Sequence, residues 1–265
     1  MSMPVASRPL EWLEHTPDHI WIKPYFFKLA GGTFTARTTV IRLCSGSLWV
    51  HSPGPLDEAT KTKLHALGPV EFLLAPSTYH HMWMPHWTLA YPDAKVYVCP
   101  GLDVKREDIK YTEILSSTPQ PEWETDIEQV LIQGRVLSEV LFLHRHTGTL
   151  IATDLVENIT DEWIKTEGLS QDWGTWLWSN LLMMKNKPLP APEYRLGGFP
   201  DPGAVSRSLS KVIGHWKPVK IILSHGQLID GGANVETALK QCWDKLILAK
   251  DKTPEEAEPP TPAQN

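Results

Sequence analysis

The sequence contains few cysteines. Among its 265 residues there are three, Cys44, Cys99 and Cys242, and none belongs to a C-x-x-C motif. An odd and widely spaced set predicts neither a disulfide framework nor a cysteine-based zinc site. Cys44 and Cys99 lie in strand-like runs, so we expect both to be small buried apolar side chains. A reducing, cytoplasmic environment is the default expectation for such a chain.

Long apolar runs and an excess of positive charge are also missing. No segment approaches the roughly 18–20 consecutive apolar residues of a membrane span, and the N-terminal residues MSMPVASRPLEWLEH lack the apolar core of a secretory signal. The 25 lysines and arginines are outnumbered by 31 acidic residues, whereas nucleic-acid-binding proteins usually show the opposite balance. We therefore expect neither a membrane nor a nucleic acid as a partner.

Two residue types are abundant instead. The chain has 12 tryptophans, where average composition would give about three or four. It also has 11 histidines, and neutral imidazole is the commonest metal ligand in proteins. Patterns such as GxSxG, the P-loop and GxGxxG are absent, so serine-hydrolase, NTPase and dinucleotide-binding functions lack their anchoring motifs.

The order of predicted elements indicates an α/β layered domain. A β-hairpin comes first, and strands then alternate with helices. The expected strands are 38–43, 47–50, 70–75, 95–99, 127–132, 139–143, 149–153 and 219–223, and the expected helices are 55–66, 79–90, 204–216 and 235–248. We interpret residues 1–250 as one domain with a Trp-rich helical insertion at about 160–190. Residues 251–265 are rich in proline and glutamate and are expected to be a disordered tail.

Three predicted strands end on residues that can bind a metal. The strand VEFLLA leads to His80 and His81, TLIAT leads to Asp154, and VKIIL leads to His225. These residues are far apart in the sequence, but the carboxyl ends of parallel strands meet at one edge of a sheet. Imidazole nitrogens together with a carboxylate form a ligand set that zinc or iron accepts.

The same residues resemble a known superfamily. A strand, a histidine cluster, a helix and YPDAKVYV, followed by LIATDL and IILSHG, are similar to the metallo-β-lactamase fold superfamily, and in particular to a divergent branch known only as a domain of unknown function. The resemblance covers roughly residues 18–248. It implies an αββα sandwich, in which the motif T-H-x-H-x-D-H and later residues hold two metal ions at strand ends.

This chain differs from that motif mainly at the ligands of one metal, and it keeps residues that can bind the other. The first-metal ligands of the superfamily fall on Pro76, Thr78 and Arg135, which cannot coordinate usefully. The second-metal ligands fall on His80, His81, Asp154 and His225, with His80 in place of an aspartate. The resemblance therefore implies one metal ion with a three-histidine, one-aspartate ligand set, with zinc as the first choice and iron or manganese as alternatives.

Other residues are candidates for the surroundings of this site. Arg135 could hold an anionic group near the emptied first site, or it could cap a surface turn. His51, at the end of an early strand, could orient a ligand ring, or it could be an ordinary core histidine. His86 and Trp83 could line the substrate pocket. In the insertion, Trp173, Trp176 and Trp178 with Met183 and Met184 could form a lid, a homodimer interface or part of the core.

We therefore predict a metal-dependent enzyme. The main hypothesis is a hydrolase in which metal-activated water attacks a small, partly aromatic or apolar ester, lactone or amide, with Arg135, His51 and Asp154 assisting. Two alternatives remain open. The same site could support a non-hydrolytic reaction, such as that of a lyase, a decarboxylase or an iron oxidoreductase. The chain could also be a degenerate member that keeps the fold for binding or assembly.

Overall fold

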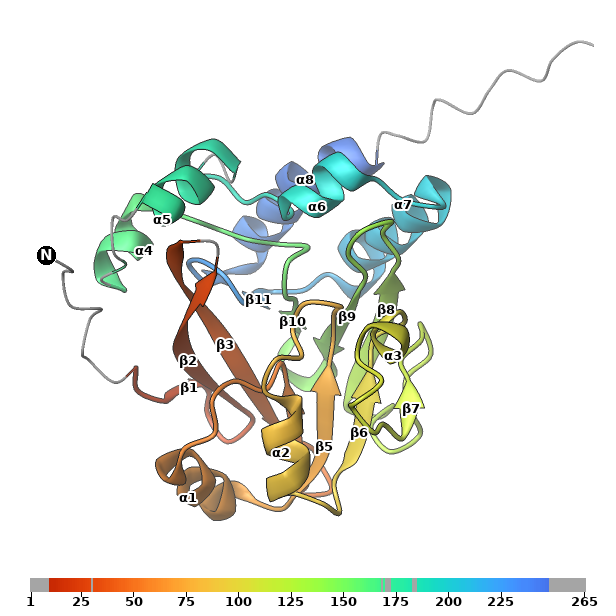
Figure 1. Cartoon of the computed structure of the whole chain (residues 1–265). Helices are drawn as coiled ribbons and strands as arrows, with labels where there is room; N and C mark the ends of the chain where they lie inside the picture. Colours follow the sequence, from red (N-terminus) through yellow and green to blue (C-terminus); the bar gives the residue numbers. More distant parts are fainter. Residues whose placement is uncertain (1–9, 30, 168, 170–172, 183–184, 248–265) are drawn as a thin grey trace, which may run out of the picture.

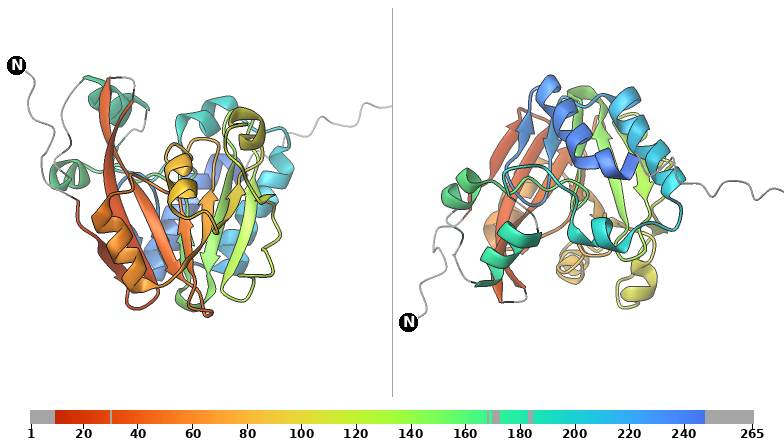
Figure 2. Two further views of the ribbon diagram at one scale, coloured as in Figure 1. Left: turned by 60° about the horizontal axis from the view of Figure 1, so that its bottom comes forward. Right: turned by 90° about the horizontal axis from the view of Figure 1, so that it is seen from above.

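Two β-sheets pack face to face, and helices cover both of their outer surfaces (Figure 1, Figure 2). The computed structural model describes residues 10–247, except 30, 168, 170–172 and 183–184. The sequence of layers is helix, sheet, sheet, helix. The expected α/β sandwich is therefore confirmed.

One sheet has seven strands in sequential order. Its first four strands pair antiparallel, and the fourth to seventh pair parallel. The strands are β1 (Leu13–Thr16), β2 (Ile20–Leu29), β3 (Gly32–Arg42), β4 (Leu48–His51), β5 (Val70–Ala75), β6 (Lys95–Val98) and β7 (Glu113–Ile114). The parallel part places the carboxyl ends of β4, β5 and β6 at one edge.

The other sheet has five strands in the order β12-β11-β10-β9-β8. Only β10 and β11 pair parallel, and the other neighbours are antiparallel. The strands are β8 (Ile127–Ile132), β9 (Glu139–His144), β10 (Thr149–Ile151), β11 (Lys220–Ile222) and β12 (Ile229–Asp230). The carboxyl ends of β10 and β11 consequently lie side by side.

The helices fall into three groups (Figure 2). The first group, α1 (Glu58–Leu67), α2 (Met84–Ala90) and α3 (Leu102–Lys105), follows strands of the larger sheet. On the opposite side of the molecule lie α7 (Pro202–Lys211), the π-helix η3 (Val212–Trp216) and α8 (Gly232–Ile247). The third group crosses one end of the sandwich and consists of α4 (Asp161–Thr166), α5 (Trp173–Leu177), the π-helix η2 (Trp178–Leu182) and α6 (Pro192–Gly197). A short 3-10 turn, η1 (Arg145–Thr147), links β9 to β10.

Three apolar clusters account for this layering. The central cluster fills the space between the sheets and includes Trp49, Phe72, Trp123 and Phe142. A second cluster joins the five-stranded sheet to α7 and α8, and a third joins the seven-stranded sheet to α1 and α2. Each sheet is therefore buried on both faces, which explains why its strands read as nearly continuous apolar runs.

The N-terminal strands differ from the expectation. Residues 13–29, which contain Pro24, were not predicted to form strands, but they form β1 and β2. β1 pairs with β2 only as far as Ile22. Beyond that point β2 is an edge strand, where the missing N–H of proline costs no ladder hydrogen bond. The helix expected at 79–90 is shorter and begins at Met84, and residues 78–83 before it form bends and turns.

The prediction for Cys44 was wrong. This residue follows β3 in the turn before β4 and is exposed, whereas Cys99 and Cys242 are buried. The link from Cys44 to Gly46 does join two antiparallel strands, as the hairpin interpretation requires.

The Trp-rich segment lies across the β2–β3 hairpin (Figure 1). The Thr33 N–H donates to the Thr175 hydroxyl at 3.0 Å, and that hydroxyl donates to the Thr33 carbonyl at 3.0 Å. Gly174 permits this approach, because a Cβ there would lie 2.6 Å from the Gly32 nitrogen. Met183, Met184 and the tail at 251–265 lie outside the described residues. Within the described part of the chain, the helices are too short or too polar to cross a bilayer.

Candidate metal centre

His80, Asp154 and His225 meet at the edge where strands of both sheets end. The Asp154 Oδ1 atom lies 3.2 Å from His80 Nε2 and 3.4 Å from His225 Nε2. One ligand atom from each residue lies within 4.8 Å of the other two, and all three residues are buried or nearly so. The structure thus brings together three residues that are separated by more than 70 positions, because β5, β10 and β11 all end at this edge.

His225 is held by strand β3 of the opposite sheet. Its Nδ1 lies 2.7 Å from the Thr35 carbonyl. A carbonyl oxygen can only accept, so Nδ1 carries a proton and Nε2 is the ring nitrogen left for a metal ion beside Asp154. Arg37, two residues along β3, is buried and donates to the carbonyls of Leu223 at 2.8 Å and Gly226 at 2.6 Å. β3 therefore fixes both the backbone and the ring of the segment that carries His225.

His80 is positioned by the turn that follows β5. The Ser77 hydroxyl accepts the backbone N–H groups of Tyr79 at 3.3 Å and His80 at 3.2 Å, which is the turn-forming role expected of serine. The His80 Nδ1 contacts the Ser52 hydroxyl at 2.7 Å. Because Nδ1 is engaged with Ser52, Nε2 is the ring nitrogen that faces Asp154.

Asp154 is fixed through its backbone by a buried glutamate. The Glu139 carboxylate accepts the backbone N–H groups of Thr153 at 2.5 Å, Asp154 at 2.9 Å and Leu155 at 2.9 Å. Burial and the nearby Asp154 raise the pKa of Glu139 to about 7, while the Thr153 and Asp154 donors act in the opposite direction. Three donors on one buried carboxylate leave the loop after β10 little freedom.

The Asp154 side chain has an unused acceptor. Its Oδ2 atom is buried and has no hydrogen-bond partner in the described structure. Although burial acts to raise the pKa of this carboxyl, His80 and His225 lower it below its ordinary value. A buried, ionised carboxylate with an orphaned oxygen is costly unless a cation satisfies it. Two imidazoles and one carboxylate are ligands that a divalent transition metal accepts, so these residues fit a metal ion.

A cavity of about 590 Å³ opens over these three residues. Its walls are mainly apolar, and the aromatic residues lining it include Tyr25, Phe27, Phe34, Trp83 and Trp178. Trp178 meets Phe34 edge-on at 5.0 Å and His225 at 6.4 Å. The ionisable side chains of Lys28, Lys105, Glu157 and Glu193 also line it. The space suits a small ligand with an apolar part and a few polar groups.

His81 lies in the cavity wall but outside the three-residue group. Its Nδ1 is 2.8 Å from the Arg106 guanidinium, which can only donate, so this nitrogen is already used as an acceptor. Burial, Lys105 and Arg106 lower the pKa of His81 to about 4. Neighbouring residues in a turn point in different directions, which separates His81 from His80.

His51 and Arg135 lie away from the cavity lining. His51 is buried and packs parallel to Trp49 at 5.7 Å and edge-on to Phe142 at 5.7 Å. Neither of its ring nitrogens has a hydrogen-bond partner in the described structure. Arg135 is exposed, and its Nε donates to the Phe199 carbonyl at 3.2 Å. This contact favours the interpretation of Arg135 as a cap of a surface turn over its interpretation as an anion-binding residue.

The aromatic candidates divide between wall and surface. Trp83 lines the cavity and packs edge-on against Tyr25 at 4.8 Å. His86 is exposed on α2 and does not line it. Trp173 and Trp176 are 68% and 55% exposed and are also outside the lining. Of the tryptophans in the insertion, Trp178 is the one that reaches the cavity, whereas Trp163 is buried in a cluster with Leu169.

Several residues of the site escaped the sequence analysis. Arg37 and Glu139 act on backbone groups of distant segments, so no local spacing marks them. Ser52 follows His51 directly, but its partner His80 lies on another strand end. The usable signal was a charged residue in a strand-like run, since Arg37 lies within β3 and Glu139 begins the apolar strand β9. Such a charge is almost never buried unless it has partners.

The comparisons with known proteins agree with this geometry. The profile of the family described as "Domain of unknown function (DUF4336)" matches residues 17–172. No curated protein matches the sequence. Solved structures match the fold closely enough to align nearly the whole chain, and all the examples below are metallo-β-lactamases.

Three solved structures illustrate the likeness. DIM-1 metallo-β-lactamase exposed to ceftazidime aligns with a TM-score of 0.57 and 12% identity, over 88% of this chain and 97% of its own. The mono-zinc form of FIM-1 from Pseudomonas aeruginosa aligns with a TM-score of 0.59 and 10% identity, over 91% and 97%. A metallo-β-lactamase from Pontibacter korlensis gives 0.55 and 12%, over 92% and 100%. At these identities the likeness establishes the fold alone.

Proposed function

The chain belongs to the DUF4336 family, and we propose that this member is a metal-dependent hydrolase with one catalytic divalent ion. The fold is that of the metallo-β-lactamases, and the described His80–Asp154–His225 group could hold a metal. The observation that carries the proposal is the buried Asp154 carboxylate, whose Oδ2 lacks a partner beside two correctly oriented imidazoles.

Zinc is the ion we propose. Two histidine nitrogens and an aspartate oxygen leave a fourth tetrahedral position open, which is the arrangement of catalytic zinc sites. The structural neighbour FIM-1 is described in a mono-zinc form, which supports one ion as sufficient to occupy this fold. With zinc, the site would supply Lewis acidity to water or to a substrate carbonyl.

The remaining residues would bind and orient the substrate. Tyr25, Phe34 and Trp178 would pack against an apolar or aromatic part and exclude water from the reacting bond. Lys105 lines the same cavity, and its Nζ donates to the Thr78 carbonyl at 2.7 Å. We assign to Lys105 the anion-holding role that the sequence analysis considered for Arg135. The proposed substrate is a small, partly aromatic ester, lactone or amide.

Metal analysis of single variants tests the ligand assignment. We expect His80→Ala, Asp154→Ala and His225→Ala each to lose one bound zinc ion per chain relative to the unaltered protein. His81→Ala is the matched control, because His81 lies outside the group of converging ligand atoms, and it should retain the ion. Loss of zinc from His81→Ala to the same degree would instead support the four-ligand set expected from the sequence.

Activity is tested separately on a panel of aryl esters, lactones and anilides. We expect hydrolysis to stop in the chelated protein and to return on addition of zinc, and we expect it to be absent from Asp154→Ala. Retention by all three ligand variants of as many zinc ions per chain as the unaltered protein binds would refute the site. Binding of zinc without hydrolysis of any substrate in the panel would favour the non-hydrolytic or the non-catalytic alternative.

A further inference from the structure

A second group of metal-ligating side chains lies at the other end of the sandwich. Cys44 follows β3, Asp126 precedes β8, and His146 lies in η1 directly after β9. The antiparallel register pairs His144, the last residue of β9, with Thr149, the first residue of β10. Because Asp154 follows the opposite end of β10, this second group is remote from the cavity.

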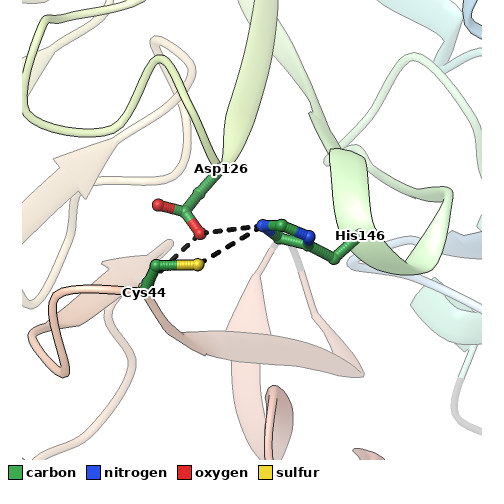
Figure 3. Close-up of side chains that lie close together, drawn as sticks. All are labelled: Cys44, Asp126 and His146. Carbon is green, nitrogen blue, oxygen red and sulfur yellow. Dashed lines mark hydrogen bonds and ion pairs between the residues drawn. The ribbon is translucent and has the colours of Figure 1, made fainter.

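The three ligand atoms converge on one point (Figure 3). Cys44 Sγ lies 3.4 Å from His146 Nε2, and His146 Nε2 lies 3.4 Å from Asp126 Oδ1. Tetrahedral zinc with ordinary bond lengths separates a sulfur from a nitrogen by about 3.5 Å and a nitrogen from an oxygen by about 3.4 Å. The observed separations therefore fit one ion bound by all three atoms.

A catalytic relay would have a different geometry. In such a relay, one ring nitrogen of the histidine contacts the nucleophile and the other contacts the carboxylate. Here Cys44 and Asp126 both approach the same Nε2 atom of His146. A cation placed among the three ligand atoms would satisfy both contacts at this nitrogen.

The ligands are held in place by groups outside the cluster. The buried Asp126 carboxylate accepts the Cys44 backbone N–H at 3.1 Å and the Thr125 hydroxyl at 3.2 Å. The His146 ring stacks on His19 at 6.4 Å with an interplanar angle of 17°. Binding a metal at this position would therefore require little reorganisation of the protein, which favours affinity.

We propose that Cys44, Asp126 and His146 form a second metal site, selective for a divalent transition metal such as zinc. A thiolate, a carboxylate and a neutral imidazole would neutralise the ion, and the softness of sulfur favours zinc over magnesium or calcium. Cys44 and His146 are exposed, so water can complete the coordination. Cys44 extends from the seven-stranded sheet, and Asp126 and His146 extend from the five-stranded sheet. The bound ion would therefore cross-link the two sheets.

Cobalt substitution tests this proposal with a readout that the first site cannot give. Co²⁺ bound to a thiolate produces an intense near-ultraviolet charge-transfer absorption, and the His80–Asp154–His225 group contains no sulfur. We expect this absorption in a His80→Ala/His225→Ala variant titrated with Co²⁺ under reducing conditions. We expect Cys44→Ser to abolish it and His146→Ala to weaken Co²⁺ binding at least tenfold.

Matched variants control for the other cysteines and histidines. Cys242→Ser alters a buried cysteine whose Sγ lies 3.5 Å from the Leu155 carbonyl, and it should keep the absorption. His65→Ala, an exposed histidine on α1, should keep the affinity. Cys44 and His146 are exposed, so their variants should match the unaltered protein in thermal unfolding with chelator present.

Stability gives an independent measurement. At a zinc concentration about 100 times the dissociation constant, binding should shift the unfolding equilibrium about 100-fold in the His80→Ala/His225→Ala variant. The same shift should be absent when Cys44→Ser is added. No thiolate absorption at a large excess of Co²⁺, or an absorption that survives Cys44→Ser, would refute the second site. Neither result would bear on the first site.

Discussion

Arg37 provides the most direct test of how the fold positions the metal centre. Its guanidinium donates to the carbonyls of Leu223 at 2.8 Å and Gly226 at 2.6 Å, with a longer contact to Ser224 at 3.5 Å. Burial lowers the pKa of Arg37 to about 10, so the side chain stays charged at neutral pH. The substitution Arg37→Met keeps a long apolar chain but removes every donor.

The expected cost follows from these contacts. Two buried carbonyl oxygens would lose their closest donor, at about 1–3 kcal/mol each, and removal of a buried charge would offset part of this. We therefore expect the free energy of unfolding to fall by about 3 kcal/mol, or the melting temperature by about 6–12 °C at this chain length. Because the freed segment carries His225, we also expect zinc affinity to fall about 10–100-fold.

Urea unfolding in the presence of chelator measures the first effect, because stabilisation by bound metal is then removed. Arg42→Met is the matched control on the same strand. Arg42 donates to the Asp18 carbonyl at 2.9 Å and carboxylate at 3.2 Å, but the Asp18 side chain is 86% exposed, so its loss should cost no more than about 1 kcal/mol. Equal losses in the two variants, or unchanged zinc affinity in Arg37→Met, would refute the argument.

Two further predictions concern acid stability and the cavity wall. Burial, with the nearby His80, lowers the pKa of His51 to about 3. The stability that depends on the neutral ring is fully present above the ordinary histidine pKa of about 6.5. It is lost as the pH falls from there toward 3, because the unfolded chain then binds a proton that the folded chain does not. His51→Leu should therefore flatten the acid limb of a stability–pH curve by up to about 1.4 kcal/mol per pH unit, and an unchanged slope would contradict the assignment. Trp178→Ala should weaken binding of an aromatic carboxylate such as benzoate, measured by calorimetry on the zinc-loaded protein, about tenfold. The exposed Trp173→Ala should leave that affinity unchanged, and equal effects in the two variants would show that Trp178 does not form the wall.

The strand ends are where the sequence was most informative. Apolar runs that lead to His80 and His81, to Asp154 and to His225 predicted strands and the edge where their ends meet. This prediction succeeded because parallel strands in a layered fold run in the same direction, so their carboxyl ends lie at one edge. No side-chain contact has to be known to predict this. The predicted strands at 70–75 and 127–132 agree with β5 and β8 in their bounds.

Side-chain directions in turns could not be predicted in the same way. His80 and His81 are adjacent, but one faces Asp154 and the other accepts from Arg106. Likewise, no strand was predicted at 20–29, yet β2 forms there and its open edge tolerates Pro24. In each case the outcome depends on a partner that is distant in the sequence.

The sequence by itself predicted the fold class and four candidate ligands at the strand ends, because strand periodicity and strand termination are local properties, and the structure brings three of the four together. Only the tertiary structure decided which neighbours complete each site. Arg37 reaches a loop 186 positions away, and Cys44 meets Asp126 and His146 across 82 and 102 positions. Such contacts arise from the packing of two sheets, and their geometry is set by loops whose conformations no local pattern specifies.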